Sequence, residues 1–174
     1  KLISQLDIAP QEAEALFETF HRRVPFIKGL RDQCARLGNN RGFITTVLGR
    51  KCRFNLFEPR FDSKQPLPHS DALEKYGEDI KRAYTYKAMN KLIQGSAADM
   101  TKKAMVELYK EGILPHTQVH DELDISVSSL EDCKKIIEIM VDCVPLVVPN
   151  KVDAEVGLSW GTAIYNYKEY DYGG

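Results

Sequence analysis

The 174-residue sequence has few cysteines, no long apolar run and almost no net charge. Its four cysteines form no C-x-x-C pair, so a zinc site is not expected and the thiols are predicted to be reduced. No apolar run approaches the length of a membrane span and no signal-peptide pattern occurs, which predicts a cytoplasmic protein, neither secreted nor membrane-bound. The formal charge of −1 gives no overall attraction to nucleic acids, so any basic surface must be local.

An apolar content of 43% over this length is enough for the core of one domain. Apolar residues at helical spacing predict helices over 1–6, 10–24, 26–37 and 128–143, and a helix or helix pair over 71–109. Pro10 is expected in the first turn of the second helix, and Ser128 or Ser129 is expected to cap the last. The second helix has an apolar stripe of Ala13, Leu16, Phe17 and Phe20. Alternating or β-branched segments predict strands over 42–48, 52–56, 117–127 and 151–158. In the last strand, the residues expected to face inward are Val152, Ala154, Val156 and Leu158. Three prolines between residues 57 and 69 predict a loop. The resulting fold class is α+β, with a small antiparallel sheet packed against several helices.

The segment Thr117–Val127 is predicted to be a β-hairpin, because polar and apolar residues alternate on both sides of His120-Asp121-Glu122. This triplet contains no Gly, Pro or Asn to favour a turn, and the adjacent carboxylates of Asp121 and Glu122 repel each other. A hard divalent cation such as Mg²⁺ would relieve that repulsion. A surface hairpin with an acidic turn and no ligand is the alternative for an isolated triplet of this kind.

Two stretches without acidic residues are candidates for contacts with nucleic-acid phosphates. The first, Arg41–Arg53, covers the predicted first hairpin and contains Arg50 and Lys51. The second, Ile80–Ala98, is predicted to be helical and contains Lys87. An ordinary solvated surface is the alternative for each stretch.

The predicted helix also carries two amides, Asn90 and Gln94, whose spacing of four residues places them on the same face. The small residues Gly95-Ser96-Ala97-Ala98 follow and permit a close approach to the backbone. Side-chain amides can donate hydrogen bonds to minor-groove acceptors, which tests groove shape without reading base sequence. Helix packing with two ordinary surface amides is the alternative.

These residues form two ordered motifs. The run Asn-Lys-Leu-Ile-Gln-Gly-Ser-Ala-Ala-Asp at 90–99, followed by Gln-Val-His-Asp-Glu-Leu at 118–123, closely resembles the C-terminal part of family A DNA polymerases, the bacterial DNA polymerase I type. The resemblance extends to the flanks, notably 1–25, 46–51 and 152–160. It implies that residues 1–40 are the end of the fingers subdomain and that residues 41–174 are palm, with the His-Asp-Glu hairpin as its catalytic hairpin.

The resemblance implies a role for each matching residue. Asp121 matches the palm carboxylate that binds the two catalytic Mg²⁺ ions, Glu122 its supporting metal-site neighbour, and His120 a histidine near the primer 3′ end. The DNA-binding residues that the resemblance implies are Asn90, Gln94 and Gln118. The basic stretches add Arg50, Lys51 and Lys87 as predicted phosphate contacts. The implied partners are primer–template DNA and dNTPs, in templated nucleotidyl transfer during DNA replication or repair, with association to the nucleoid of a bacterial or phage-infected cell.

The sequence also departs from the family pattern. Tyr86 stands where the family commonly has an arginine. No counterpart is found for the first palm aspartate, for the Arg and Lys of the fingers helix, or for the carboxylates of a 3′–5′ exonuclease. Asp121 and Glu122 alone cannot hold two metal ions about 3.5–4 Å apart. We therefore expect the chain to be inactive alone, as one piece of a split, phage-encoded or truncated polymerase, and to need an N-terminal fragment that carries the missing groups.

Two other functions are compatible with the motifs. A non-catalytic DNA-binding or assembly module would retain the polymerase fold and bind DNA without metal. A metal-dependent nuclease would need a further carboxylate beside Asp121 and Glu122, for which Asp99 and Asp124 are the nearest candidates.

Overall fold

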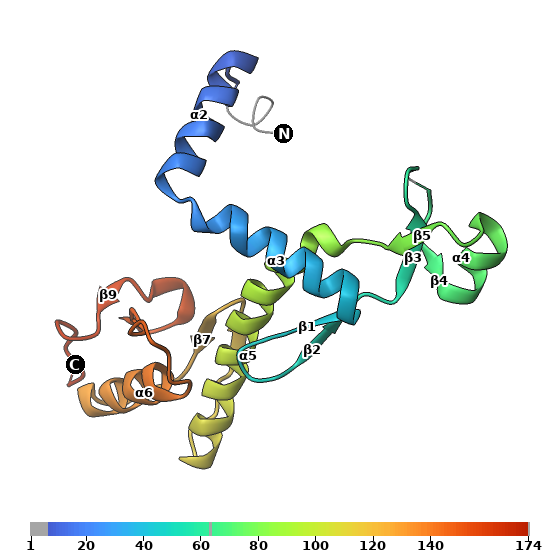
Figure 1. Ribbon diagram of the computed structural model, residues 1–174. Helices are drawn as coiled ribbons and strands as arrows, with labels where there is room; N and C mark the ends of the chain where they lie inside the picture. The colour runs from blue at the N-terminus through green and yellow to red at the C-terminus, as the bar shows by residue number, and fades with distance from the viewer. Residues whose placement is uncertain (1–6, 63, 174) are drawn as a thin grey trace. The chain divides into compact units, whose positions relative to one another are not determined.

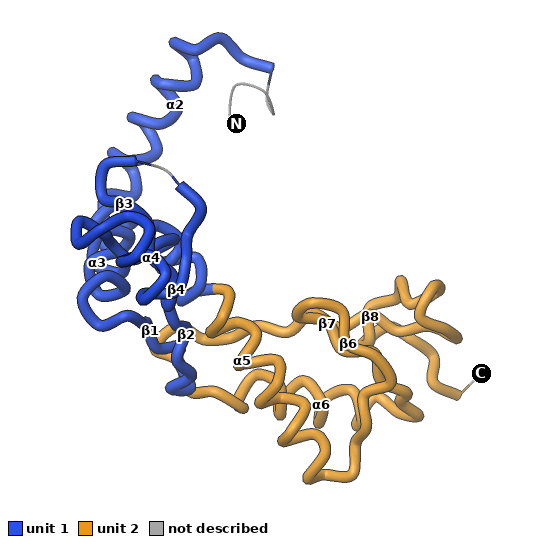
Figure 2. Tube along the Cα trace, turned by 90° about the vertical axis from the view of Figure 1, so that its right-hand side faces the viewer, with its two compact units in different colours: residues 1–93 blue, residues 94–174 orange. Residues whose placement is uncertain are grey.

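The computed structural model describes residues 7–62 and 64–173, which form two compact units, 1–93 and 94–174 (Figure 2). Helices alternate with short strands along the chain (Figure 1), and every strand pair of the described residues is antiparallel. The predicted α+β class is therefore confirmed. Instead of one small sheet, the described residues form four separate sheets of two or three strands each. No described helix combines the length and the apolar character needed to cross a membrane.

Unit 1 begins with two helices, α2 (Pro10–Arg23) and α3 (Phe26–Arg41). Pro10 occupies the first turn of α2, as predicted, where its missing N–H costs no hydrogen bond. The end of α3 was predicted wrongly. The helix continues through Gly38 and stops at Gly42, which takes the left-handed φ of 76° that terminates helices. The predicted helix over residues 1–6 lies outside the described residues.

The core of unit 1 forms between α3 and the first hairpin. Strands β1 (Phe43–Thr45) and β2 (Lys51–Arg53) pair in antiparallel register, as predicted, with Gly49 at φ 84° in the connecting turn. The buried side chains are Cys34, Ile44, Phe54 and Ala88. In contrast, the predicted apolar stripe of α2 is not covered by the described residues, since Leu16, Phe17 and Phe20 are each about half exposed.

The segment between residues 56 and 87 differs most from the prediction. Strands β3 (Leu56–Pro59), β4 (Leu67–Pro68) and β5 (Ile80–Arg82) form a sheet in the order β4-β3-β5, where a loop and a helix were predicted. Helix α4 (His69–Tyr76) stops at Gly77, whose φ is 78°. A 3₁₀ turn, η1 (Thr85–Lys87), then leads into the long helix. Pairing of β3 with β5 supplies hydrogen bonds that the local sequence pattern does not reveal.

Helix α5 (Ala88–Lys110) runs without interruption from unit 1 into unit 2. In unit 2 it is followed by β6 (Thr117–Val119), β7 (Glu122–Asp124) and α6 (Leu130–Asp142). Of Ser128 and Ser129, either of which was predicted to cap α6, Ser129 is the cap, because its side chain accepts a hydrogen bond from the Asp132 N–H.

The end of unit 2 is only partly as predicted. The strand expected over 151–158 is reduced to β8 (Glu155–Val156), which pairs with β9 (Tyr165–Asn166) from the tyrosine-rich tail. Val156 is buried as expected, whereas Leu158, also expected to face inward, is 94% exposed. Between these strands lies the 3₁₀ turn η2 (Trp160–Thr162).

Candidate active site

The predicted hairpin is present, with a two-residue turn at His120 and Asp121 between the paired residues Val119 and Glu122. His120 has a φ of 55°, a conformation that glycine usually provides at this position of a hairpin turn. The Gln118 side-chain amide donates a hydrogen bond to the His120 carbonyl. The tip is thus a strained turn that is held in place by its own strand.

The strand register corrects the predicted alternation of apolar and polar faces. Residues directly opposite in an antiparallel pair share a face, so Val119 lies with Glu122, and Gln118 lies with Leu123. The pattern of polar-outward and apolar-inward residues therefore does not hold across both strands. Val119 is 40% exposed, although its alternation predicted an inward position.

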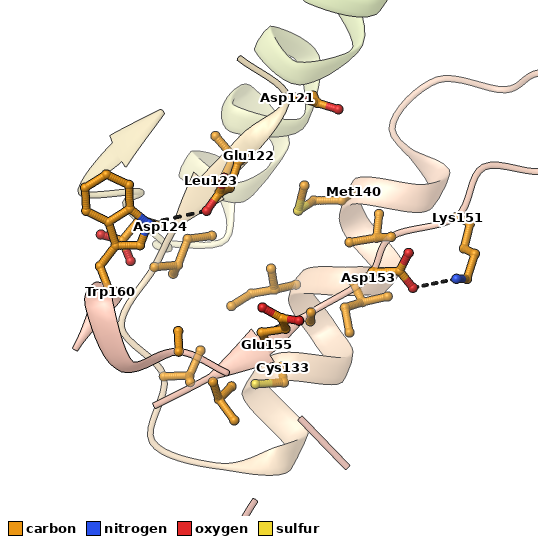
Figure 3. A pocket seen from close by; sticks show the side chains of 18 residues that line it. Asp121, Glu122, Leu123, Asp124, Cys133, Met140, Lys151, Asp153, Glu155 and Trp160 are labelled. Atoms are coloured by element: carbon orange, nitrogen blue, oxygen red, sulfur yellow. Dashed lines mark hydrogen bonds and ion pairs between the residues drawn. The ribbon is translucent and has the colours of Figure 1, made fainter. Parts of the chain in front are cut away.

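An open cleft of about 630 Å³ lies within unit 2 beside β7 (Figure 3). Helix α6 forms part of its apolar wall, through Cys133, Ile136, Ile137 and Met140. Five carboxylates line it, those of Asp121, Glu122, Asp124, Asp153 and Glu155. The single lining cation, Lys151, is 2.6 Å from an oxygen of Asp153. The charge of this cleft favours cations over nucleic-acid phosphates.

The two carboxylates predicted to be catalytic point in different directions. Asp121 is exposed at the tip, whereas the Glu122 side chain is directed at Trp160 (Figure 3). The Trp160 indole N–H donates to Oε1 of Glu122 at 3.3 Å. Across residues 7–62 and 64–173 there is no group of three or more His, Cys, Asp or Glu side chains that could hold a metal ion. These residues therefore do not by themselves fit a bound Mg²⁺.

The predicted minor-groove amides lie one turn apart on α5, and both Asn90 and Gln94 are exposed. Among the residues that the structure describes, neither side-chain amide has a protein partner. Gln118 is also exposed, but one of its amide N–H groups is engaged with His120, which leaves a second N–H for any other acceptor. The structure thus presents both α5 amides to solvent.

The basic residues divide into exposed and structural groups. Lys87 lies over the rings of Tyr84 and Tyr86, 4.9 and 5.6 Å from their centroids, and Lys51 lies 4.7 Å from the centroid of Phe43. Arg50 is exposed in the β1–β2 turn.

Arg82, from the second predicted basic stretch, has a structural role. It lies on β5 instead of a helix, and it donates to the Phe54 carbonyl at 2.9 Å and the Asn39 carbonyl at 3.1 Å. Its guanidinium also approaches Gly42 so closely that a Cβ there would lie 2.8 Å from Cζ. The predicted basic helix over 80–98 was therefore wrong over residues 80–87, which contain β5 and the turn η1, and α5 begins only at Ala88.

Sequence reasoning missed Trp160 and the carboxylates of Asp153 and Glu155 as neighbours of the hairpin. The available signal for Trp160 was that it is the single tryptophan of the chain, close to the predicted last strand. For the carboxylates the sequence held no comparable signal, because Asp153 and Glu155 reach the cleft only through tertiary packing.

Residues 1–162 match DNA polymerase family A. A DNA-directed DNA polymerase of Pseudomonas phage M6 is 39% identical over 157 residues, which cover 90% of this chain and 21% of the phage protein. The thermostable DNA polymerase I of Thermus filiformis is 30% identical over 167 residues, covering 92% of this chain and 18% of that protein. This chain thus spans about a fifth of the length of these relatives.

A similar structure has also been solved, the POL domain of Pol1 from M. smegmatis in complex with DNA primer-template and dNTP. It has a TM-score of 0.70 and 28% sequence identity, and the similarity covers 94% of this chain and 28% of that one. The likeness extends over nearly all of the chain.

Proposed function

Because this chain belongs to DNA polymerase family A, we propose that it contributes a hairpin carboxylate and primer–template contacts to a DNA-directed DNA polymerase. The observation that carries the proposal is the exposed Asp121 at a strained two-residue tip beside an acidic cleft, inside a region that matches the family. Such a turn presents side chains that a relaxed glycine turn would not carry. The reaction would be templated nucleotidyl transfer from dNTPs to a primer, in DNA replication or repair.

Each exposed side chain has one task in this proposal. Asp121 places a negative charge at the reaction centre, and His120 lies beside the primer 3′ end. Asn90 and Gln94 donate to minor-groove acceptors, which tolerates any base pair of normal shape. Arg50, Lys51 and Lys87 neutralise backbone phosphates. The assignment of residues 1–40 to the fingers and 41–174 to the palm belongs to the same proposal, since the division at Ile93 and Gln94 reflects compactness and not subdomain function.

The metal site is proposed to be shared with residues outside these 174. Two Mg²⁺ ions in such a site would polarise the reacting oxygens and neutralise charge on the triphosphate. Asp121 and Glu122 diverge, and the described residues offer no third ligand. We therefore assign only Asp121 to direct metal contact, and the remaining ligands to an N-terminal polymerase fragment that carries the first palm aspartate and the fingers helix.

Exposed apolar side chains in unit 2 support such a partner. Val147, Val148, Leu158 and Ile164 are each more than 70% exposed. Val147 and Val148 are adjacent in the chain, and exposed apolar side chains that lie together are typical of protein–protein contacts. The fragment would cover these side chains, and the chain alone is expected to be inactive.

Primer extension tests the proposal, with the chain alone and after mixing with the N-terminal remainder of a related polymerase. Synthesis is expected only in the mixture, and Asp121→Ala is expected to abolish it. Asp153→Asn is the matched control, because it removes a carboxylate that lines the same cleft but is paired with Lys151. Synthesis by the chain alone, or undiminished synthesis by the Asp121→Ala mixture, would contradict the proposal.

A non-catalytic DNA-binding module is the second candidate, favoured by the absence of a three-ligand cluster among the described residues. It predicts DNA binding that needs no metal and no synthesis in any mixture. Asp121→Ala would then leave binding unchanged or stronger, since a negative charge is removed. The nuclease hypothesis has less support, because Asp99 is buried on α5 and the described residues offer no third metal ligand beside Asp121 and Glu122.

A further inference from the structure

We infer that Trp160 is a positioning residue for Glu122. Its indole N–H, 3.3 Å from Oε1, holds the Glu122 carboxylate toward the cleft and leaves Asp121 alone at the hairpin tip (Figure 3). The consequence for catalysis rests on the function proposed above. The hydrogen bond itself can be tested without it.

The position of the indole follows from local backbone structure. In η2, Ser159 and Thr162 form a reciprocal capping box, with the Ser159 N–H donating to the Thr162 hydroxyl at 3.0 Å. Gly157 lies so close to this turn that a Cβ there would be 2.1 Å from the Thr162 carbonyl oxygen. The pairing of Val156 with Tyr165 joins the two ends of the 157–164 segment that contains η2. Trp160 is therefore carried by a turn with little room to shift.

The electrostatics of the cleft explain why Glu122 takes this donor. Four other carboxylates line the cleft, and its one lining cation, Lys151, is already paired with Asp153. The indole N–H is a donor with no acceptor capacity, so it can only stabilise a carboxylate oxygen. A hydrogen bond to an ionised group is stronger than one between neutral groups. Among the described residues, Trp160 thus supplies the side-chain hydrogen bond to the Glu122 carboxylate.

The hydrogen bond separates the roles of two adjacent acids. Without it, Glu122 is free to turn toward the tip, where its charge would add to that of Asp121 and compete for the same cation. With Glu122 held, the tip presents one carboxylate in a fixed direction. Preorganisation of this kind acts on the rate of the chemical step more than on substrate binding.

Nuclear magnetic resonance of the 174-residue chain tests the contact directly, because a protein with a single tryptophan gives one indole N–H resonance. Glu122→Ala, which removes the acceptor, is expected to move this resonance and to speed its exchange with water. Asp153→Asn, which changes a carboxylate in the same cleft without touching the indole, is expected to leave it in place. An indole resonance that is identical in the wild type and in Glu122→Ala would overturn the inference.

Primer extension in the mixed enzyme tests the positioning role. Trp160→Phe keeps an aromatic ring but removes the donor, and is expected to lower kcat by about two- to tenfold, the size of one hydrogen bond, with KM for dNTP unchanged. Adding it to Glu122→Ala, which already lacks the acceptor, is expected to cause no further loss. Fully additive losses, or a rise in KM alone, would refute the positioning role. A wild-type mixture without synthesis would instead refute the proposed function, and the resonance would still decide the contact.

Discussion

Replacing Gly157 with alanine tests the close backbone approach that carries Trp160. The added Cβ would lie 2.1 Å from the Thr162 oxygen, 2.5 Å from its carbonyl carbon and 2.7 Å from the Ala163 nitrogen. Because all three atoms belong to the backbone, no side-chain rotation relieves the overlap. Overpacking of this kind costs roughly 1–3 kcal/mol, and the lower entropy of the unfolded alanine chain offsets about 0.4–1 kcal/mol.

At the middle of these two ranges the net loss of stability is about 1.3 kcal/mol, which corresponds to a fall in Tm of about 3–5 °C for a chain of this size. Urea denaturation followed by tryptophan fluorescence measures it, and it reports on unit 2 because Trp160 is the single tryptophan. Gly161→Ala is the matched control, since a Cβ there meets nothing within 4 Å. It is expected to be as stable as the wild type or up to about 1 kcal/mol more stable. Equal stability and equal indole resonances in the two variants would refute the reasoning.

Four further predictions concern other elements. In α3, Gly29→Ala is expected to stabilise unit 1 by about 0.5–1 kcal/mol, because alanine favours the helix and its Cβ would meet nothing within 4 Å. Gly38→Ala is expected to gain less stability or to lose it, because its Cβ would lie 3.2 Å from the Phe54 ring. Thermal unfolding of the two variants measures the difference. At the start of α6, hydrogen bonds from Ser128 lower the pKa of Asp132 below its unfolded value of about 3.9. The resulting stability is present above that pH and lost as the pH falls through the folded pKa, so Ser128→Ala is expected to flatten the acid limb of an unfolding curve measured against pH. His120→Gly is expected to stabilise unit 2 by about 1 kcal/mol, because it removes the strain of a positive φ. The gain would appear as a higher urea midpoint. The same variant is expected to lower synthesis in the mixed enzyme. Asn90→Ala and Gln94→Ala are expected to weaken primer–template binding equally across base sequences in a fluorescence anisotropy titration, and a sequence-dependent loss would contradict a minor-groove role.

Local signals in the sequence were sufficient for the elements whose boundaries are set by local chemistry. Pro10 begins α2, Ser129 caps α6 and Gly49 turns the first hairpin, each for a reason that depends on the residue itself. The end of α3 shows the limit of such signals. Gly38 and Gly42 are both candidates for a helix terminator, and only the packing of Phe54 against Gly38 shows that the first one lies inside the helix.

Elements that depend on distant partners were not predictable in the same way. Strand β5 pairs with β3 more than twenty residues earlier, and the helical pattern of the local sequence gives no sign of it. At the site, the sequence located Asp121 and Glu122 at a hairpin tip. It did not give the register, which sets the direction of each side chain, nor the contact between Glu122 and Trp160, which are 38 residues apart. The α5 amides were easier to place, because a continuous helix fixes their common face.

The hairpin tip carries two unfavourable features that have a common physical meaning. His120 takes a left-handed φ that glycine would adopt without strain, and the next two residues are both acids. A turn selected for stability alone would have neither feature. The tip is stabilised from its sides instead, by the Gln118 amide on the His120 carbonyl and by the Trp160 indole on Glu122. Both contacts leave the Asp121 side chain exposed, which is the arrangement expected if the turn is maintained for the carboxylate that it presents.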